Sequence, residues 1–264
     1  MIKLIASDLD GTLVNDQGKI SDKIYDMIPK LNKKGVKFAA ASGRTYLQLK
    51  NNFKNVNGNM VFVAHNGALI KGNRSNKPIY SNSISEGNIK LILGLKPELG
   101  EEMLLSADDE AFVVKPSHKL LKEFNEGGVP YVILNSYDEI KKPIYKVSYY
   151  IAPENRRKIM EFLKNNLNED LDFVESGEKW VDIMNNGVSK GNAIKILQQT
   201  YGIDKENTMV FGDYYNDLTM FKNAAYSYAM GNAPEDVKKH AKFVADSNND
   251  NGVYNVIRRV EASI

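Results

Sequence analysis

Three short apolar runs in the first 64 residues are separated by stretches with helical patterns, and this rhythm constrains the fold more than any other feature. Residues 2–5, 36–41 and 60–64 are rich in aliphatic and β-branched side chains, which is typical of buried strands. Between the first two runs, apolar side chains from Ile24 to Leu31 fall on one helical stripe. Strands that alternate with helices in this way form a parallel sheet wound with crossover helices.

The first of these helices carries a proline in its interior. Ser21 is placed to cap its start and Gly35 to end it, since glycine readily adopts the left-handed conformation found after helix ends. Pro29 lacks a backbone N–H and crowds the preceding turn, so we expect a kink or a break at that position.

The rhythm changes between residues 83 and 186, a segment that we call the insert. Its helical segments are interleaved with strands in which polar or aromatic residues alternate with apolar ones. This texture predicts an α+β unit whose antiparallel sheet is covered by helices on one face. The expected helices lie at 85–95, 117–126 and 153–166, and the expected strands at 102–106, 111–114, 131–134, 145–151, 171–175 and 179–184.

The first pattern resumes after the insert. A helix that Ser189 or Asn186 opens leads to a buried strand at 208–212, a helix at 218–223, short strands at 225–229 and 243–244, and a terminal helix at 252–262. The predicted fold class is α/β, with a Rossmann-like parallel-sheet core that carries helices on both faces. Residues 1–82 and 187–264 are expected to form this core, and residues 83–186 an inserted α+β domain.

The charge of the chain is nearly balanced, with 35 lysine and arginine residues against 33 aspartate and glutamate residues and a net charge of +2. This balance argues against a protein that binds nucleic acid or a membrane surface through bulk positive charge. The chain has no cysteine, which excludes disulfides and thiolate chemistry, and no apolar run approaches the length of a membrane span. With no signal-like segment at the start of the sequence, we expect a cytoplasmic protein.

Two aspartates stand at the end of the first predicted strand, in the run Asp8-Leu9-Asp10-Gly11. In an extended segment, residues two apart share a face, so both carboxylates point one way and Leu9 the other. Two like charges about 4 Å apart repel by roughly 4 kcal/mol at an intermediate effective dielectric constant. Such crowding predicts a cation nearby, although the run alone is equally typical of an Asp-rich turn with Gly11 at its corner.

Three further groups of polar residues are expected at the same edge of the sheet. They are Ser42-Gly43-Arg44 after the second strand, Gly212-Asp213-Tyr214-Tyr215-Asn216-Asp217 at the end of the strand at 208–212, and Lys190 at the start of a helix. Parallel α/β sheets bind ligands outside the carboxyl ends of their strands. Carboxylates, a lysine and short hydroxyl and amide donors together suit a magnesium-assisted phosphate site, because Mg2+ prefers oxygen ligands. Each group alone is also explained as a turn, a helix cap or a surface lysine.

These four groups, in this order, resemble the four motifs of the haloacid dehalogenase superfamily. The matching residues are Asp8-Leu9-Asp10-Gly11-Thr12-Leu13, Ala41-Ser42-Gly43-Arg44, Lys190 and Gly212-Asp213-Tyr214-Tyr215-Asn216-Asp217. Within the superfamily the chain is similar to the Cof-type phosphatases, which carry a large α/β cap domain of the C2 type after the second motif. The resemblance covers essentially the whole chain, and inside the insert it concerns only size and element order.

The resemblance implies a role for each matching residue. Asp8 is the nucleophile that forms an aspartyl-phosphate, and Asp10 is the general acid and base. The cofactor Mg2+ is held by the Asp8 carboxylate, the Asp10 backbone carbonyl and Asp213. The phosphoryl oxygens are bound by Leu9, Ser42, Gly43, Lys190 and Asn216. Arg44, Asn66 and Asp217 would lie next to these residues and support them.

The function implied is the hydrolysis of a small phosphorylated metabolite. Sugar phosphates are the first expectation for the substrate, followed by cofactor phosphates such as flavin mononucleotide or pyridoxal phosphate. Two other classes stay open: a signalling switch that keeps its phospho-aspartate, and a catalytically idle phosphosugar-binding protein. His65 is expected to pack beside the site, and Trp180, Tyr145, Tyr149 and Tyr150 mainly to pack in the insert. The oligomeric state is not specified by the sequence.

Overall fold

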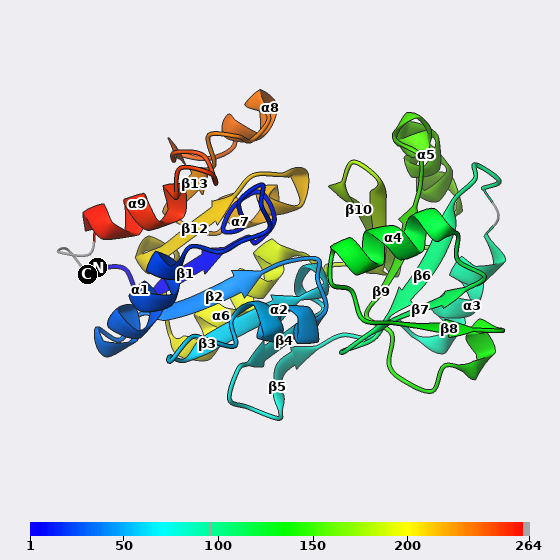
Figure 1. Ribbon diagram of the computed structural model, residues 1–264, viewed down its shortest axis with the longest axis horizontal. Helices are drawn as coiled ribbons and strands as arrows, with labels where there is room; N and C mark the ends of the chain where they lie inside the picture. Colours follow the sequence, from blue (N-terminus) through cyan, green and yellow to red (C-terminus); the bar gives the residue numbers. More distant parts are fainter. Residues whose placement is uncertain (96, 261–264) are drawn as a thin grey trace.

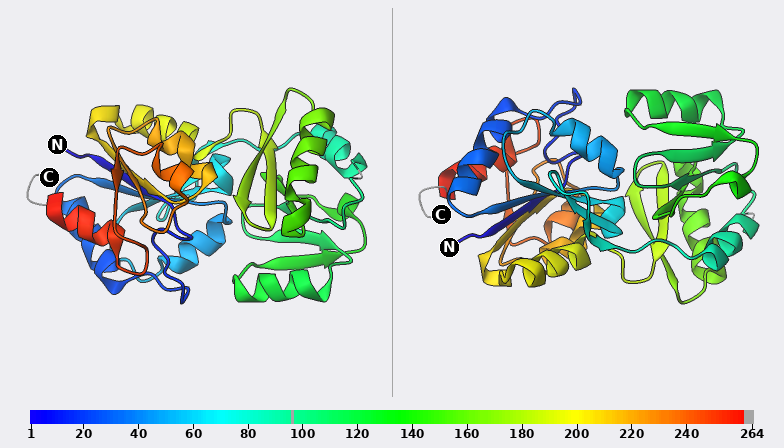
Figure 2. Two further views of the ribbon diagram at one scale, coloured as in Figure 1. Left: turned by 90° about the horizontal axis from the view of Figure 1, so that it is seen from above. Right: turned by 90° about the horizontal axis from the view of Figure 1, so that it is seen from below.

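Over residues 1–95 and 97–260, which the structure describes, the computed structural model shows an eight-stranded and a six-stranded sheet side by side (Figure 1). The chain leaves the larger sheet after β5 (Pro78–Ser81) and returns to it with α6 (Lys190–Tyr201). The two views of Figure 2 show the segment between them as a separate lobe beside the larger sheet. The predicted α/β class with an inserted α+β unit is therefore confirmed.

The eight-stranded sheet has the order β14-β13-β12-β1-β2-β3-β4-β5. Its other strands are β14 (Phe243–Val244), β13 (Tyr226–Ala229), β12 (Thr208–Gly212), β1 (Leu4–Ser7), β2 (Lys37–Ala41), β3 (Met60–Ala64) and β4 (Leu69–Gly72). Neighbours from β14 to β3 pair in parallel, as predicted. At the far edge, β4 and β5 add an antiparallel hairpin that was not predicted, because glycine, asparagine, serine and proline interrupt this segment and are typical of loops.

Helices cover both faces of this sheet. One face carries α1 (Asp22–Lys33), α2 (Tyr46–Asn52) and α9 (Gly252–Val260), and the other carries α6, α7 (Leu218–Phe221) and α8 (Glu235–Lys238). Ile5 enters the first core and its neighbour Leu4 the second, so the strands read as continuous apolar runs. The terminal helix was expected to reach residue 262, and its last two positions lie outside the described residues.

The first helix differs from its prediction at the proline. α1 runs through Pro29 as one helix, so a break, one of the two outcomes expected there, is wrong. Met27, Ile28 and Leu31 are at most 3% exposed and hold this part of the helix on the sheet, which offsets the hydrogen bond that proline cannot donate. Gly35 follows the helix with a φ of 79°, the left-handed conformation expected after a helix end.

The six-stranded sheet has the order β10-β11-β9-β6-β7-β8. Its strands are β6 (Glu102–Ser106), β7 (Ala111–Val114), β8 (Tyr131–Leu134), β9 (Lys146–Tyr150), β10 (Leu171–Gly177) and β11 (Trp180–Asn185). The pairs are antiparallel except that β7 and β8 run in parallel. The prediction of a wholly antiparallel sheet is thus wrong at this pair, where α4 (His118–Glu126) forms the crossover that a parallel connection needs.

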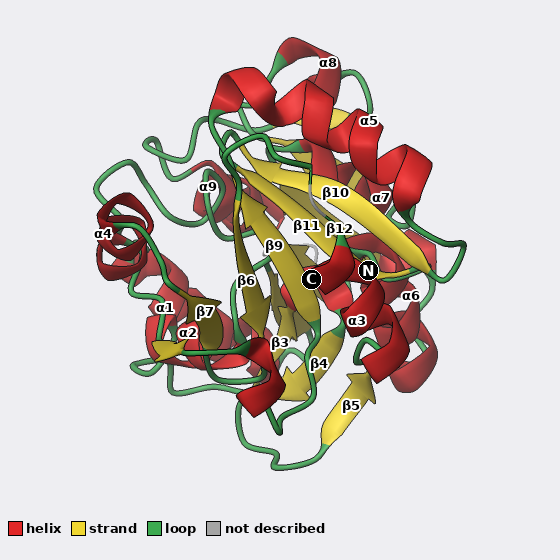
Figure 3. Cartoon of the chain, turned by 90° about the vertical axis from the view of Figure 1, so that its right-hand side faces the viewer, coloured by secondary structure: helices red, strands yellow, loops and turns green. Residues whose placement is uncertain are grey.

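Both faces of the smaller sheet contact helices, rather than the one face that was expected. Seen from the end of the molecule, α3 (Glu86–Gly94) and α5 (Arg156–Asn166) lie in front of the sheet, on its outer face (Figure 3). On the inner face, α4 packs against only part of the sheet, including Leu104 and Val113. Short 3₁₀ turns are η1 (His65–Gly67), η2 (Tyr137–Glu139), η3 (Pro153–Asn155), η4 (Lys205–Asn207) and η5 (Tyr215–Asp217).

The inner face of the smaller sheet is polar where α4 does not cover it. Asp182 of β11 stands opposite Ser148 of β9, and Trp180 stands opposite Tyr150. Their odd-numbered neighbours, such as Val147, enter the apolar core under α3 and α5. Because strand residues alternate between faces, this register turns the polar set toward the larger sheet.

Candidate active site

The candidate site lies at the carboxyl end of β1. The strand order reverses there, since β1 leads to β2 on one side while β12 leads to β13 on the other. The register pairs Ser7 with Phe211, and the Asp8 N–H donates to the Phe211 carbonyl at 2.9 Å. In open α/β sheets a ligand crevice forms at such a reversal. A cavity of about 500 Å³ opens here, lined by residues of both sheets.

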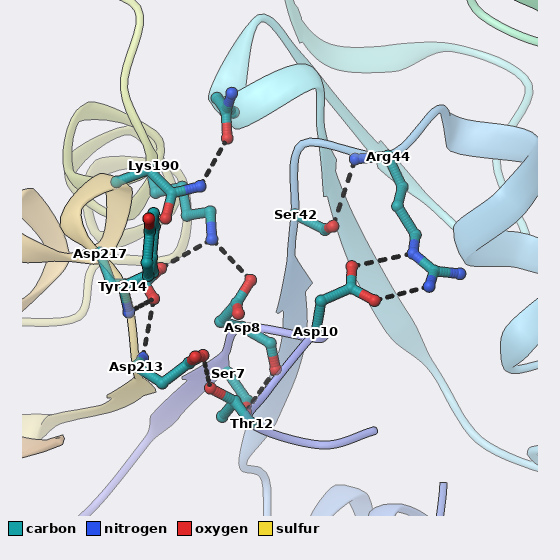
Figure 4. A network of polar contacts seen from close by, with 12 residues as sticks. Ser7, Asp8, Asp10, Thr12, Ser42, Arg44, Lys190, Asp213, Tyr214 and Asp217 are labelled. Carbon is teal, nitrogen blue, oxygen red and sulfur yellow. Dashed lines mark hydrogen bonds and ion pairs between the residues drawn. The ribbon is translucent and has the colours of Figure 1, made fainter. Parts of the chain in front are cut away.

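Three carboxylates and one lysine are buried together at this point. Lys190 Nζ lies 2.5 Å from Oδ1 of Asp8 and 2.6 Å from Oδ1 of Asp217, and its side chain is only 1% exposed. Ligand atoms of Asp8, Asp213 and Asp217 all lie within 4.8 Å of one another. Figure 4 shows these side chains, from segments some 200 residues apart, converging beside the end of β1. One lysine cannot neutralise three carboxylates, so the cluster carries excess negative charge when all are ionised.

Burial and mutual repulsion raise the pKa values of two acids in this cluster. The pKa of Asp8 is raised well above its ordinary value by burial first and by the Asp217 carboxylate second, against the opposing effect of Lys190. The same two causes raise the pKa of Asp213 to about 6. Burial alone would lower the pKa of Lys190, but the carboxylates of Asp217 and Asp8 outweigh it and raise that pKa. The cluster would therefore be stabilised by a further cation.

The donor set fits a hard divalent cation. Its ligands are carboxylate oxygens, without histidine or cysteine, and oxygen donors are what Mg2+ prefers. Gly11 makes room for this arrangement: its φ is 76°, and a Cβ there would collide with the Asp213 carboxylate. Thr12 Oγ1 donates to Asp213 Oδ1 at 2.7 Å and so fixes that carboxylate against the loop after β1.

Asp217 differs from the other two acids because protein donors occupy both of its oxygens. Oδ1 accepts from Lys190, and Oδ2 accepts from the backbone N–H groups of Asp213 and Tyr214 at 2.9 and 3.1 Å. Its side chain is fully buried. These contacts hold the loop after β12 and Lys190 in fixed relative positions.

Asp10 is engaged by Arg44 rather than by the acidic cluster. Nε and Nη2 of Arg44 donate to the two carboxylate oxygens of Asp10 at 2.9 and 2.6 Å. Figure 4 shows the Asp10 carboxylate turned toward Arg44 while that of Asp8 turns toward Lys190. Asp8 and Asp10 were expected to point to the same side at the end of the strand. Both line the cavity, in agreement with this expectation. Leu9 points the other way, into the core with Ile5.

The remaining predicted residues lie around the same cavity. Ser42, Gly43 and Asn216 line it, and Ser42 Oγ accepts from the Arg44 N–H at 3.2 Å. Asn66 is buried behind them, and its Oδ1 accepts from Asn216 Nδ2 at 3.1 Å. The sequence-predicted residues therefore come together at one edge of the larger sheet.

Comparison with known proteins identifies the family of this chain. A family model described as haloacid dehalogenase-like hydrolase matches residues 5–257. The chain belongs to this family. The predicted superfamily and enzyme class are thus confirmed, and the chain is a hydrolase of the haloacid dehalogenase-like, Cof-type phosphatase group.

Relatives of this hydrolase align over nearly their full length. The 5-amino-6-(5-phospho-D-ribitylamino)uracil phosphatase YbjI of Escherichia coli is 29% identical over 266 residues, which cover 98% of this chain and 96% of that protein. The phosphatase YcsE of Bacillus subtilis, named for the same compound, is 28% identical over a stretch that covers 97% of this chain and 95% of that protein. The crystal structure of SMU.1108c from Streptococcus mutans superposes with a TM-score of 0.91 at 28% identity, covering 99% of this chain and 100% of that one.

Some cavity residues of this hydrolase were not predicted from the sequence. Lys146, Ser148 and Asp182 of the insert line the cavity and were not singled out, and Thr12, which contacts Asp213 beside it, stood in the quoted motif without a role. The available signal was a period of two, since Lys146 and Ser148 alternate with apolar residues along β9. That pattern shows that one face is polar, but not what the face opposes.

The aromatic and histidine side chains divide between core and cavity. Trp180 lines the cavity beside Tyr150, with ring centroids 4.9 Å apart, whereas Tyr149 is buried in the core under α3 and α5. His65 is fully buried and stacked on Tyr145 at 5.5 Å, which agrees with the expected packing position. Of the helices in residues 1–95 and 97–260, none combines the length and the apolar character required to cross a membrane.

Proposed function

We propose that this hydrolase is a Mg2+-dependent phosphatase that cleaves small phosphomonoesters through an aspartyl-phosphate on Asp8. The observation that carries the proposal is the buried cluster of three carboxylates around Lys190 at the cavity. Membership of a hydrolase family favours turnover over a signalling switch that keeps its phosphoryl group, or an idle binding protein.

In the first step, an Asp8 carboxylate oxygen attacks phosphorus and the bond from phosphorus to the leaving oxygen breaks. Lys190 holds Asp8 by the contact at Oδ1, which orients the nucleophile and places a positive charge beside the transferred group. In the second step, water attacks the phosphoryl group, which restores the Asp8 carboxylate and releases inorganic phosphate.

Asp10 moves the protons of both steps. It donates a proton to the leaving oxygen and then accepts one from the attacking water. Both of its carboxylate oxygens accept hydrogen bonds from Arg44 in this structure, so Asp10 has to turn away from Arg44 before it can reach a leaving group. Arg44 is then free to contact the substrate, which gives it a supporting role next to the acid.

Mg2+ would be held by the carboxylates of Asp8 and Asp213 and the backbone carbonyl of Asp10, with Asp217 orienting Lys190 and the Asp213 loop. A bound Mg2+ would supply positive charge that polarises a phosphoryl oxygen and lessens the repulsion between the phosphoryl group and the Asp8 carboxylate. The other phosphoryl oxygens would be bound by the side chains of Ser42, Lys190 and Asn216 and the backbone amides of Leu9 and Gly43.

The insert, residues 83–186, would form the cap domain that selects the organic part of the substrate. It contributes Trp180, Phe124 and Leu104 to the cavity wall, together with Glu123 and Ser148. Apolar ring faces beside polar groups suit a sugar or polyol phosphate. Two relatives are named for a ribityl phosphate that carries an aminouracil ring, so such compounds belong in a substrate screen beside sugar phosphates.

The test is phosphate release by the wild type, Asp8→Asn and Asp26→Asn over a panel of phosphomonoesters, with and without Mg2+. Asp8→Asn should keep its fold and lose at least about a thousandfold in kcat, because the nucleophile is gone. Asp26 is exposed on α1, so Asp26→Asn serves as the matched control with wild-type rates. Full activity in Asp8→Asn, or a wild type that releases no phosphate from any member, contradicts the proposal.

A further inference from the structure

Asp182 of β11 is a buried carboxylate of the insert that faces the larger sheet. It is 1% exposed, and three side chains donate to it: Ser148 Oγ at 2.5 Å, Asn66 Nδ2 at 2.9 Å and Lys146 Nζ at 3.0 Å. Asn66 belongs to η1, which follows β3 of the larger sheet. The carboxylate therefore joins the insert to a loop of the active site.

Two contacts continue from this point to groups beside the cavity. Asn66 Oδ1 accepts from Asn216 Nδ2 at 3.1 Å, and Lys146 Nζ donates to the Gly43 carbonyl at 2.8 Å. A Cβ at Gly43 would lie 3.3 Å from Asn66 Oδ1 and 3.5 Å from Asp182 Oδ2, so the three residues are in close contact. Asn216 and Gly43 are two of the five residues to which phosphate binding was ascribed above.

The charge of Asp182 determines the direction of this chain of hydrogen bonds. A carboxylate only accepts, so the amide nitrogen of Asn66 has to face it. The Asn66 oxygen then faces Asn216, which has to present its own amide nitrogen in return. An amide nitrogen carries two hydrogens, so the second N–H of Asn216 is available for an anion in the cavity.

We propose that Asp182 is a positioning residue for phosphate binding, which acts through Asn66 to orient the amide of Asn216. The inference rests on the proposed function, because it uses Asn216 as a phosphate ligand. Lys146 neutralises Asp182 and holds the Gly43 peptide in the same network. A buried ion pair adds little net stability over apolar packing, so its presence between the two sheets is better explained by the groups that it orients.

The test is the binding of inorganic phosphate in the presence of Mg2+, measured by titration calorimetry on the full chain. The variants are Asp182→Asn, Asn216→Ala and the double variant, with Asp172→Asn on the neighbouring strand β10 as the exposed control. Asp182→Asn should weaken phosphate binding about tenfold, because Asn66 can then reverse its amide. Added to Asn216→Ala, the same substitution should have no further effect, since the residue through which it acts is gone.

Hydrolysis supplies a second readout on the same variants. Asp182→Asn should lower kcat/KM by similar factors for an aryl phosphate and a sugar phosphate, because it acts on the phosphoryl group that both share. A loss confined to one leaving group, losses that multiply in the double variant, or unchanged phosphate binding each overturn the inference. A wild type that binds phosphate but hydrolyses no phosphomonoester overturns the proposed function instead.

Asn66→Gly tests the same chain of contacts if Asp182→Asn fails to fold. Asn66 has a φ of 55°, which glycine adopts without strain, so this variant removes the bridging amide and keeps the backbone. It should weaken phosphate binding about as much as Asp182→Asn, and about tenfold relative to the wild type. Wild-type phosphate binding in Asn66→Gly overturns the inference.

Discussion

Lys190 and Lys146 both lie beside buried carboxylates, but the charge around them differs. Lys190 contacts Asp8 and Asp217 and stands near Asp213, so one positive charge faces three carboxylates. Among the residues that the structure describes, Lys146 forms its one ion pair with Asp182 and uses another hydrogen for the Gly43 carbonyl. The first group comes from the larger sheet and its loops, and the second from the insert.

The difference separates a ligand site from a positioning device. A buried group with uncompensated charge is costly, so the Lys190 group would be stabilised by a cation that the protein itself does not supply. The Asp182 pair is neutral and its carboxylate has donors on both oxygens, so it requires no ligand. Charge imbalance, more than burial, therefore marks where Mg2+ would bind.

The largest effect that tests this comparison is the removal of each lysine. Lys190→Met leaves Asp8 and Asp217 without their cation and should lower the free energy of unfolding by about 3–5 kcal/mol without metal. Lys146→Met also leaves a buried carboxylate without its cation, but Asp182 keeps two hydrogen-bond donors, so a loss at the lower end of this range, about 3 kcal/mol, is expected. Urea denaturation of both variants, with and without Mg2+, measures these losses.

The response to Mg2+ distinguishes the two lysines further. In Lys190→Met the ion should restore part of the lost stability, because it replaces a missing positive charge. In Lys146→Met it should stabilise no more than it does in the wild type. Equal losses in the two variants, together with equal recovery by Mg2+, would contradict the distinction between them.

The second prediction concerns the metal itself and its dependence on pH. Mg2+ at a hundred times its dissociation constant should raise the free energy of unfolding of the wild type by about 2.7 kcal/mol. This gain should shrink as the pH falls through 6, because protons compete with the metal for Asp213, whose pKa is raised to about 6.

Without metal, the contribution of Asp213 to the free energy of unfolding changes with pH in the opposite direction. The folded protein keeps a proton on Asp213 up to about pH 6, whereas the unfolded chain releases it near 3.8, so stability from this group falls as the pH rises between these values. Asp213→Asn should abolish the stabilisation by Mg2+, and Asp182→Asn, from the balanced pair, should retain it. Thermal melts at pH 5 and 7.5 measure this, and a full Mg2+ effect in Asp213→Asn would refute the assignment.

The Lys190 group could be predicted from the sequence and the Asp182 pair could not. Asp8 and Asp213 each follow a continuous apolar strand, and parallel strands bring their carboxyl ends to one edge, so their meeting follows from connectivity. Lys146 and Asp182 lie on antiparallel strands whose partners depend on register. A period of two shows that they share a face with polar neighbours, but only the packed structure shows that this face meets Asn66.

The other departures have similar physical causes. The hairpin of β4 and β5 lies in a segment rich in glycine, asparagine, serine and proline, a composition typical of loops rather than strands. The parallel pairing of β7 with β8 comes with the α4 crossover between them, but a helix between two strands does not by itself show that those strands pair with each other. Tertiary burial on the sheet keeps α1 continuous at Pro29 against the local preference for a break.

The last prediction concerns His65, whose pKa depends in part on the charge of Lys146. Burial, and secondly the positive charge of Lys146, lower the pKa of His65 from 6.5 to about 3. Between these values the unfolded chain binds a proton that the folded protein does not, so stability is lost as the pH falls below 6.5. The loss should approach about 1.4 kcal/mol per pH unit relative to His65→Asn, a variant suited to the left-handed φ of 49°.

Combining His65→Asn with Lys146→Met sharpens the comparison of the two lysines. Removing the Lys146 charge should bring the pKa of His65 closer to its ordinary value, so the effect of His65→Asn on the pH dependence of stability should become smaller. If His65→Asn changes the pH dependence of stability equally with and without Lys146, then burial alone lowers the pKa of His65. The charge of Lys146 would then have no effect on His65.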